Sequence, residues 1–136
     1  MIVPKRYESG VLDTCTYIDL DVIEPECLPE FPEITAITLA ELHQGVVMTP
    51  DTAVRAIRIE KLGAAVADFD PLPFTEQAAA RYGTLVGLVL AAGRNPKPRR
   101  MDLMIAAIAS VHNMPLYTRN PEDFKGIENR LTVVSV

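Results

Sequence analysis

Three acidic residues stand next to short apolar segments, and their type and placement suit metal-ion chemistry. Asp13 ends a short apolar run, Glu41 lies inside the largely apolar stretch 37–42, and Asp102 opens the apolar run 103–109. Ligands of parallel α/β sheets bind at the carboxyl ends of strands. Carboxylates delivered there from separate segments would form an oxygen-rich pocket, which suits a hard divalent cation. The pattern therefore indicates metal-assisted cleavage of a phosphodiester bond.

Each of these acids also has a structural interpretation. Asp13 could cap the helix that follows it, unless Thr14 is the cap and leaves the carboxylate free. Thr38 and Glu41 have the spacing of a capping box, in which the glutamate folds back on the N–H of the cap residue. Asp102 suits the positive end of a helix dipole, a role compatible with binding a metal. The recurrence favours a common site, because clustered carboxylates repel one another by roughly 4 kcal/mol per pair and need cations.

The charge of the chain is uneven. The net charge of −5 argues against a general nucleic-acid coat. Basic residues nevertheless gather just before Asp102 and beside a fourth polar cluster, residues 118–124, which follows an apolar stretch. The basic residues of this strip are Arg94, Lys97, Arg99, Arg100 and Arg119. They could hold RNA phosphates, or they could form a solvated loop surface.

Length and composition predict one domain, residues 1–136, with residues 1–8 as a poorly ordered N-terminal extension. Hydrophobic residues make up 49% of the sequence, enough for a sizeable core. No apolar run approaches the ~18 residues of a membrane span. The start of the chain lacks the long apolar segment of a signal peptide, so we expect a cytoplasmic protein that does not bind a membrane.

Cysteines and histidines add little to the candidate site. Cys15 and Cys27 form no Cys-x-x-Cys pair, so neither a zinc site nor a disulfide is expected. Cys15 is a weak candidate nucleophile because no histidine is paired with it. His43 is expected on a different helix face from Glu41, and His112 at a helix end, so both are interpreted as structural.

Short apolar segments alternate with helical patterns along the chain, which predicts a parallel sheet wrapped by helices. The predicted strands are 10–13, 33–36, 71–74, 115–118 and 131–136. The predicted helices are 14–22, 38–48, 50–68, 76–92 and 102–112, with Thr49 and Thr75 as N-caps and Gly93 as a stop. The proline-rich segments 24–32 and 95–98 are predicted loops.

Four segments together resemble the PIN domain, and specifically the VapC-type toxins of bacterial toxin–antitoxin pairs. The matching segments are 11–14, 38–46, 102–107 and 118–124, and the resemblance extends from about residue 9 to the end of the chain. It implies a three-layer α/β/α sandwich with a central, mainly parallel sheet. It also implies an Mg²⁺-dependent endoribonuclease, with Mn²⁺ as a substitute ion, that forms a homodimer and is held inactive by a VapB-type antitoxin.

The resemblance also assigns roles to particular residues. The acidic metal-site residues that it implies are Asp13, Glu41 and Asp102. The fourth family position, often aspartate, falls on the neutral amide Asn120, and Asp123 is a second candidate for the missing charge. The polar residues that it implies as orienting the acids or a water are Thr14, Thr38 and Thr118.

Parts of the sequence also fit two other interpretations. A PIN-like binding module without activity is favoured by Asn120 and opposed by the three intact acids. A phosphoacceptor receiver domain would need paired acids after the first strand and a lysine after a late strand, which this chain lacks. The segments 16–22 and 53–66 have apolar faces that could bury an antitoxin helix or simply pack in the core.

Overall fold

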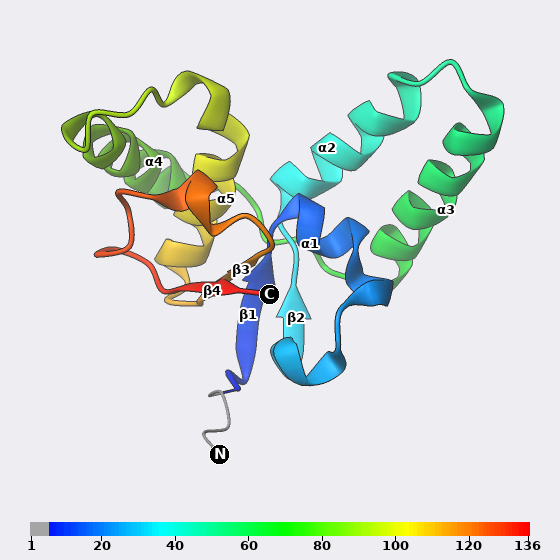
Figure 1. The fold of residues 1–136 in the computed structure, drawn as a ribbon, viewed down its shortest axis with the longest axis horizontal. Helices are drawn as coiled ribbons and strands as arrows, with labels where there is room; N and C mark the ends of the chain where they lie inside the picture. The colour runs from blue at the N-terminus through cyan, green and yellow to red at the C-terminus, as the bar shows by residue number, and fades with distance from the viewer. Residues whose placement is uncertain (1–5) are drawn as a thin grey trace.

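A four-stranded parallel sheet forms the centre of the computed structural model, which describes residues 6–136 (Figure 1). The strands are β1 (Ser9–Leu12), β2 (Phe31–Glu33), β3 (Leu116–Thr118) and β4 (Val133–Ser135). They lie in the order β2-β1-β3-β4, and every neighbouring pair is parallel. Because parallel neighbours need crossover connections, the segments between these strands must pass over the faces of the sheet.

Helices cover both faces of this sheet. The α-helices are α1 (Thr14–Ile18), α2 (Ala36–Val47), α3 (Thr52–Asp68), α4 (Glu76–Ala91) and α5 (Arg100–Val111). Short 3₁₀ turns are η1 (Leu20–Val22), η2 (Pro25–Cys27), η3 (Lys97–Arg99) and η4 (Pro121–Phe124). In Figure 1, α4 and α5 lie on one side of the strands and α1 to α3 on the other, with the α2–α3 hairpin projecting outward.

Alternate residues of each strand point to opposite layers, as the two-residue period of a strand requires. Val11 and Leu116 are paired neighbours that pack with the core residues of α4 and α5. Leu12 and Tyr117 are the next pair, and they pack with residues of α1, α2 and α3. All four are at most 1% exposed. The predicted three-layer α/β/α sandwich is therefore confirmed.

Helix α5 is buried along most of its length, as its apolar sequence predicts. The run from Leu103 to Ser110 includes seven residues that are at most 5% exposed. Three of them are alanines, and α5 packs closely against α4 on one side and against the sheet core on the other. This packing fixes the start of α5, and with it Asp102, relative to the strands.

Three helix starts differ from their predicted positions. Helix α5 begins at Arg100, two residues before the predicted start at Asp102. Thr35 caps α2, because its hydroxyl accepts a hydrogen bond from the N–H of Thr38 at 3.2 Å. Asp51 caps α3, because its carboxylate accepts two backbone N–H bonds. The predicted starts at Thr38 and Thr49 are wrong. At α2 and α3 the capping residue is the last one with extended backbone, and that position depends on how the chain leaves the preceding segment.

Other element boundaries also differ. The helix predicted over 14–22 breaks at Ile18 and continues as η1, and the strand predicted over 71–74 is reduced to a bridge between Thr35 and Leu72. The two predicted loops contain η2 and η3, because proline is tolerated in the first turn of a helix. Strand β2 begins earlier than predicted and carries Pro32, as an edge strand can. The predicted stops at Asp68 and Gly93 are confirmed.

The predicted N-terminal extension lies outside the described residues at positions 1–5. Within the part that is described, the carbonyls of Tyr7 and Glu8 accept backbone hydrogen bonds from Glu30 and Phe31, at 3.1 and 2.8 Å. The ring of Tyr7 also packs edge-on against Tyr117, with 6.5 Å between ring centroids. These contacts guide the chain into β1. None of the helices in the described range is long and apolar enough to cross a membrane.

Gly10 is required by the close approach of β1 to a buried ring. A Cβ atom at this position would lie 2.5 Å from Cε1 of Tyr117, which is 1% exposed and has no space to move into. We expect Gly10→Ala to lower the free energy of unfolding by about 1–3 kcal/mol, measured by urea denaturation. Gly83→Ala is the control, because a Cβ there meets no atom within 4 Å and alanine favours the helix by up to about 1 kcal/mol. Equal effects of the two variants would contradict this account.

Candidate active site

The predicted acidic residues lie at the carboxyl edge of the sheet, although they come from different elements. Asp13 directly follows β1, Glu41 lies in α2 beyond β2, and Asp102 is in the first turn of α5. Asn120 and Asp123 come after β3. The charges of Asp13, Glu41 and Asp123 all act on Asp102, so the carboxylates share one region of negative potential.

Asp13 is buried and performs a structural task with one of its oxygens. The side chain is 4% exposed, and Oδ1 accepts a hydrogen bond of 3.0 Å from the N–H of Thr16, which caps α1. The backbone N–H of Asp13 donates to the carbonyl of Tyr117 at 3.1 Å, which ties the residue to β3. Thr14 is therefore not the cap. The capping bond uses only Oδ1, so capping leaves Oδ2 for another partner.

Glu41 is held by a short chain of hydroxyl groups. The hydroxyl of Thr14 donates to Oε1 at 2.7 Å, and the hydroxyls of Thr14 and Thr38 are 3.0 Å apart. Because the single hydroxyl proton of Thr14 goes to Glu41, the hydroxyl of Thr38 must donate to Thr14. The capping-box interpretation is wrong, since Thr35 is the cap and Glu41 reaches across to α1.

Asp102 is the acid whose surroundings most disfavour its charge. Burial raises its pKa from 3.8 to about 7, and the negative charges of Asp123, Asp13 and Glu41 contribute in that order. The guanidinium of Arg99 opposes this shift without cancelling it. Near neutral pH the carboxyl group is therefore divided between its protonated and charged forms. A cation placed beside it would favour the charged form.

The fourth polar cluster is organised by Thr118 and Arg99. The hydroxyl of Thr118, which is 0% exposed, accepts a hydrogen bond of 2.9 Å from the N–H of Asn120 and so fixes the turn after β3. Asp123 forms an ion pair of 3.1 Å with Arg99, and both side chains are about one-third exposed. Arg99 therefore offsets part of the charge of Asp123, a pairing that the sequence did not indicate.

The predicted basic strip divides into engaged and exposed side chains. The guanidinium of Arg94 donates to the carbonyls of Glu122 and Lys125, at 2.9 and 3.0 Å. Arg119 forms an ion pair of 3.3 Å with Asp19. Lys97 and Arg100 are exposed. Both could therefore meet a phosphate without first leaving a protein partner.

A divalent cation fits the acids by donor type. Carboxylate oxygens are hard donors of the kind that Mg²⁺ prefers, and a cation would offset the repulsion that raises the pKa of Asp102. Within residues 6–136, however, no three His, Cys, Asp or Glu side chains already stand close enough together to hold one ion. The carboxylates would have to turn toward a common point to bind it.

A groove of about 440 Å³ leads away from Glu41 between α1, α2 and α3. Its lining combines three apolar side chains, a glycine and four charged side chains: Ile18, Leu42, Ile57, Gly45, Asp21, Glu41, Arg58 and Lys61. Ile18 and Ile57 are 49% and 67% exposed. The apolar faces of α1 and α3 were visible in the sequence, but their joining into one groove beside Glu41 depends on the packing of three helices.

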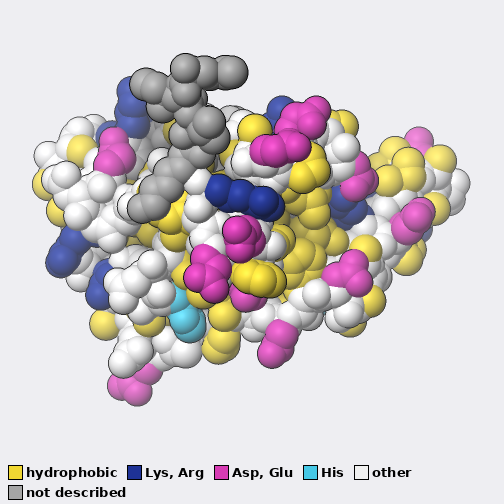
Figure 2. All heavy atoms as spheres, turned by 90° about the horizontal axis from the view of Figure 1, so that it is seen from below, with side chains coloured by type: hydrophobic (Ala, Val, Ile, Leu, Met, Phe, Trp, Pro, Cys, Tyr) yellow, Lys and Arg dark blue, Asp and Glu magenta, His cyan; other side chains and the backbone are white. Residues whose placement is uncertain are grey.

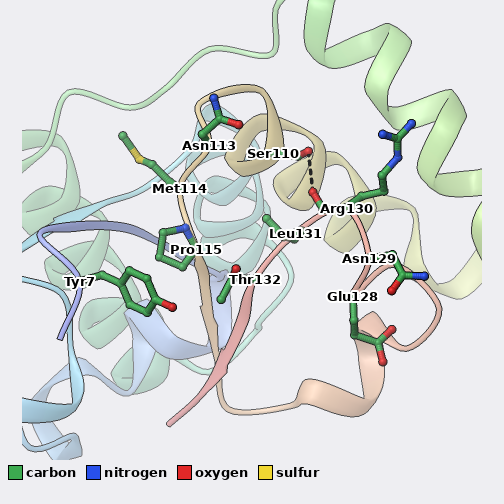
Figure 3. Close-up of a pocket in the computed structure, with 10 residues that line it drawn as sticks. All are labelled: Tyr7, Ser110, Asn113, Met114, Pro115, Glu128, Asn129, Arg130, Leu131 and Thr132. Carbon is green, nitrogen blue, oxygen red and sulfur yellow. Dashed lines mark hydrogen bonds between the residues drawn. The ribbon is translucent and has the colours of Figure 1, made fainter. Parts of the chain in front are cut away.

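A second hollow lies at the opposite, amino-terminal end of the sheet (Figure 3). It is lined by the residues that lead into β1, β3 and β4, among them Tyr7, Pro115 and Thr132. Ser110 in its wall already accepts from Arg81 and donates to the carbonyl of Arg130 at 3.2 Å. In Figure 2, which shows this side of the molecule, acidic and basic side chains are intermingled.

Comparisons with known proteins agree with this architecture. No protein-family model matches the chain. The chain is 33% identical to Ribonuclease VapC5 of Mycobacterium tuberculosis (strain ATCC 25618 / H37Rv) over 128 residues. The aligned region covers 92% of this chain and 92% of that protein. The crystal structure of VapBC-5 from Mycobacterium tuberculosis superimposes with a TM-score of 0.81 and 30% identity, over 95% of this chain and 99% of that chain.

A second solved structure shows the same fold. VapBC-1 from nontypeable Haemophilus influenzae superimposes with a TM-score of 0.71 and 25% identity, over 93% of this chain and 97% of that chain. The fold and the acidic edge define an α/β protein of the PIN-domain class. The chain belongs to the VapC family of ribonucleases from VapBC toxin–antitoxin systems.

The raised pKa of Asp102 predicts a pH-dependent stability. The folded state binds the proton of Asp102 more tightly than the unfolded chain does. The contribution of this group to the free energy of unfolding therefore falls as the pH rises from 3.8 to about 7. Asp102→Asn removes this titration. In EDTA we expect the variant to match wild type near pH ~4 and to be more stable by about 1–2 kcal/mol at pH ~8, after allowance for solvent screening. Urea denaturation at several pH values measures the difference, and a gap independent of pH would contradict the prediction.

Proposed function

We propose that this protein is an endoribonuclease toxin that cleaves RNA at its acidic edge, with Mg²⁺ as cofactor and Mn²⁺ as a substitute. The observation that carries the proposal is the influence of the Asp13 and Glu41 charges, which follow β1 and lie in α2, on Asp102 of α5 in a chain of the VapC family. Asp13, Glu41 and Asp102 would hold the ion. When bound, the ion supplies Lewis acidity, which lowers the pKa of a water and stabilises the leaving oxygen of the phosphodiester.

The remaining roles follow from the contacts of the side chains. Thr14 and Thr38 orient the carboxylate of Glu41 through their two hydroxyl groups. Asp13 offers Oδ2 while Oδ1 holds α1 in place. Thr118 positions Asn120, whose amide would contribute a neutral oxygen at the fourth family position. Lys97 and Arg100 would contact flanking phosphates, since both are exposed.

Metal-dependent cleavage tests this proposal directly. We expect protein free of antitoxin to cleave a mixed RNA pool in Mg²⁺ or Mn²⁺ and to be inactive in EDTA. Asp13→Asn should reduce cleavage by at least about 100-fold and leave the thermal transition nearly unchanged, because asparagine also caps helices. Electrophoresis of end-labelled RNA measures the cuts.

Two results would contradict the proposal. Cleavage that survives in EDTA would remove the metal from the mechanism, and cleavage by Asp13→Asn at the wild-type rate would remove Asp13. A folded protein that binds RNA without cutting it would instead support an inactive binding module, for which the neutral Asn120 would be the first explanation.

We further propose that a VapB-type antitoxin occupies the groove beside Glu41. The two solved relatives above are VapBC proteins, and the groove offers Ile18, Leu42 and Ile57 as apolar contacts among charged side chains of both signs. An amphipathic helix lays its apolar face into such a groove. A partner seated there would extend to Glu41 and obstruct access to the acids. The homodimer implied by the family resemblance stays a prediction.

Two isoleucines of α3 offer a matched test of the groove. Ile57 lines it, whereas Ile59 is 52% exposed and is not part of its lining. We expect Ile57→Asp to weaken antitoxin binding by at least about 10-fold, because it places a charge against a buried apolar face, and Ile59→Asp to leave binding nearly unchanged. Titration calorimetry with the VapB-type antitoxin measures both. Equal losses would place the antitoxin elsewhere.

A further inference from the structure

Arg99 interacts with two acids on the side of the site that faces η4: it forms an ion pair with Asp123, and its charge also acts on Asp102. It ends η3 and lies three residues before Asp102, at the entry to α5. Its guanidinium lies 3.1 Å from Oδ1 of Asp123, and both side chains are about two-thirds buried. A pair that is partly shielded from water is screened less by salt than an exposed one. Arg99 therefore serves as a fixed positive charge at this edge of the acidic cluster.

The other groups on that side add no uncompensated negative charge. The fourth family position is Asn120, a neutral amide, and its turn is fixed by Thr118. Asp123, the remaining carboxylate, is already paired with Arg99. A second divalent cation placed here would meet one neutral oxygen donor and a carboxylate that already has the guanidinium of Arg99 as its partner. By contrast, Asp13 and Glu41 on the other side form no ion pair with a described residue.

The Arg99–Asp123 pair is held by its surroundings. Arg94 donates to two carbonyls at the start and end of the η4 segment, and this fixes the turn that carries Asp123. Arg99 leads directly into α5, whose next turns are buried. The backbone on both sides of the pair is therefore held in place by other contacts. The pair is consequently a fixed feature of the site.

We propose that Arg99 takes the place of a second divalent cation, so that the active site binds one metal ion per chain. This inference rests on the proposed metal-dependent function and goes beyond it, because it fixes the number of ions. The ion would lie on the side of Asp13, Glu41 and Asp102, while the guanidinium neutralises Asp123. An arginine has five N–H donors, so Arg99 can retain Asp123 and still donate to a phosphate oxygen of the substrate.

The number of bound ions tests this inference without any measurement of activity. We expect wild-type protein, titrated with Mn²⁺ and followed by electron paramagnetic resonance of the free ion, to bind one Mn²⁺ per chain. Arg99→Gln should bind two, because Asp123 becomes an uncompensated donor. Adding Asp123→Asn to Arg99→Gln should restore one. Arg100→Gln is the matched control: it removes the same charge from an exposed neighbour and should keep one.

The outcomes separate this inference from the proposed function. Two ions in wild type would overturn the inference and leave metal-dependent cleavage intact, whereas no bound ion would overturn both. A single ion in folded Arg99→Gln would also overturn it. If Arg99→Gln fails to fold, Asp123→Asn in the wild-type background decides: it should keep one ion per chain, and loss of the ion would show that Asp123, not Arg99, completes the metal site.

Discussion

Carboxylates from several different elements lie near one edge of the sheet, and the repulsion that they exert on Asp102 must be borne by the fold. The cost is visible at Asp102, where burial and three neighbouring charges raise the pKa to about 7. The fold bears this cost because α5 is anchored by its buried length. The surrounding groups then act as compensation: a capping N–H for Asp13, a hydroxyl for Glu41 and a guanidinium for Asp123.

The layers of the fold could be predicted from the sequence because their signals are local. The apolar run of α5, the cap at Thr75 and the stop at Gly93 are each determined by a few neighbouring residues. The caps at Thr35 and Asp51 were missed because several polar residues stand close together there. Which of them becomes the cap depends on where extended backbone ends, and that is set by how the chain leaves the preceding segment.

The candidate site could be predicted in its residue types but not in its pairings. The acids were recognisable from their places next to apolar segments. The contact between Thr14 and Glu41 joins residues 27 positions apart, and Arg94 reaches carbonyls 28 and 31 positions away. Nothing in the local pattern distinguishes Arg94, which supports a turn, from Arg100, which is exposed. Such partners follow from how the crossovers are packed.

The hydrophobic core consists of two clusters, one on each face of the sheet, and this has a consequence for how the protein can be inactivated. Glu41 belongs to the layer of α1 to α3, and Asp102 belongs to the layer of α4 and α5, with the sheet between them. The acidic edge therefore exists only while both layers are docked. A local opening of either one would separate the carboxylates before the chain as a whole unfolds. The arrangement of the acids therefore depends on the packing of both layers. A protease or chaperone that loosened one layer would inactivate the site without binding to any of the acids.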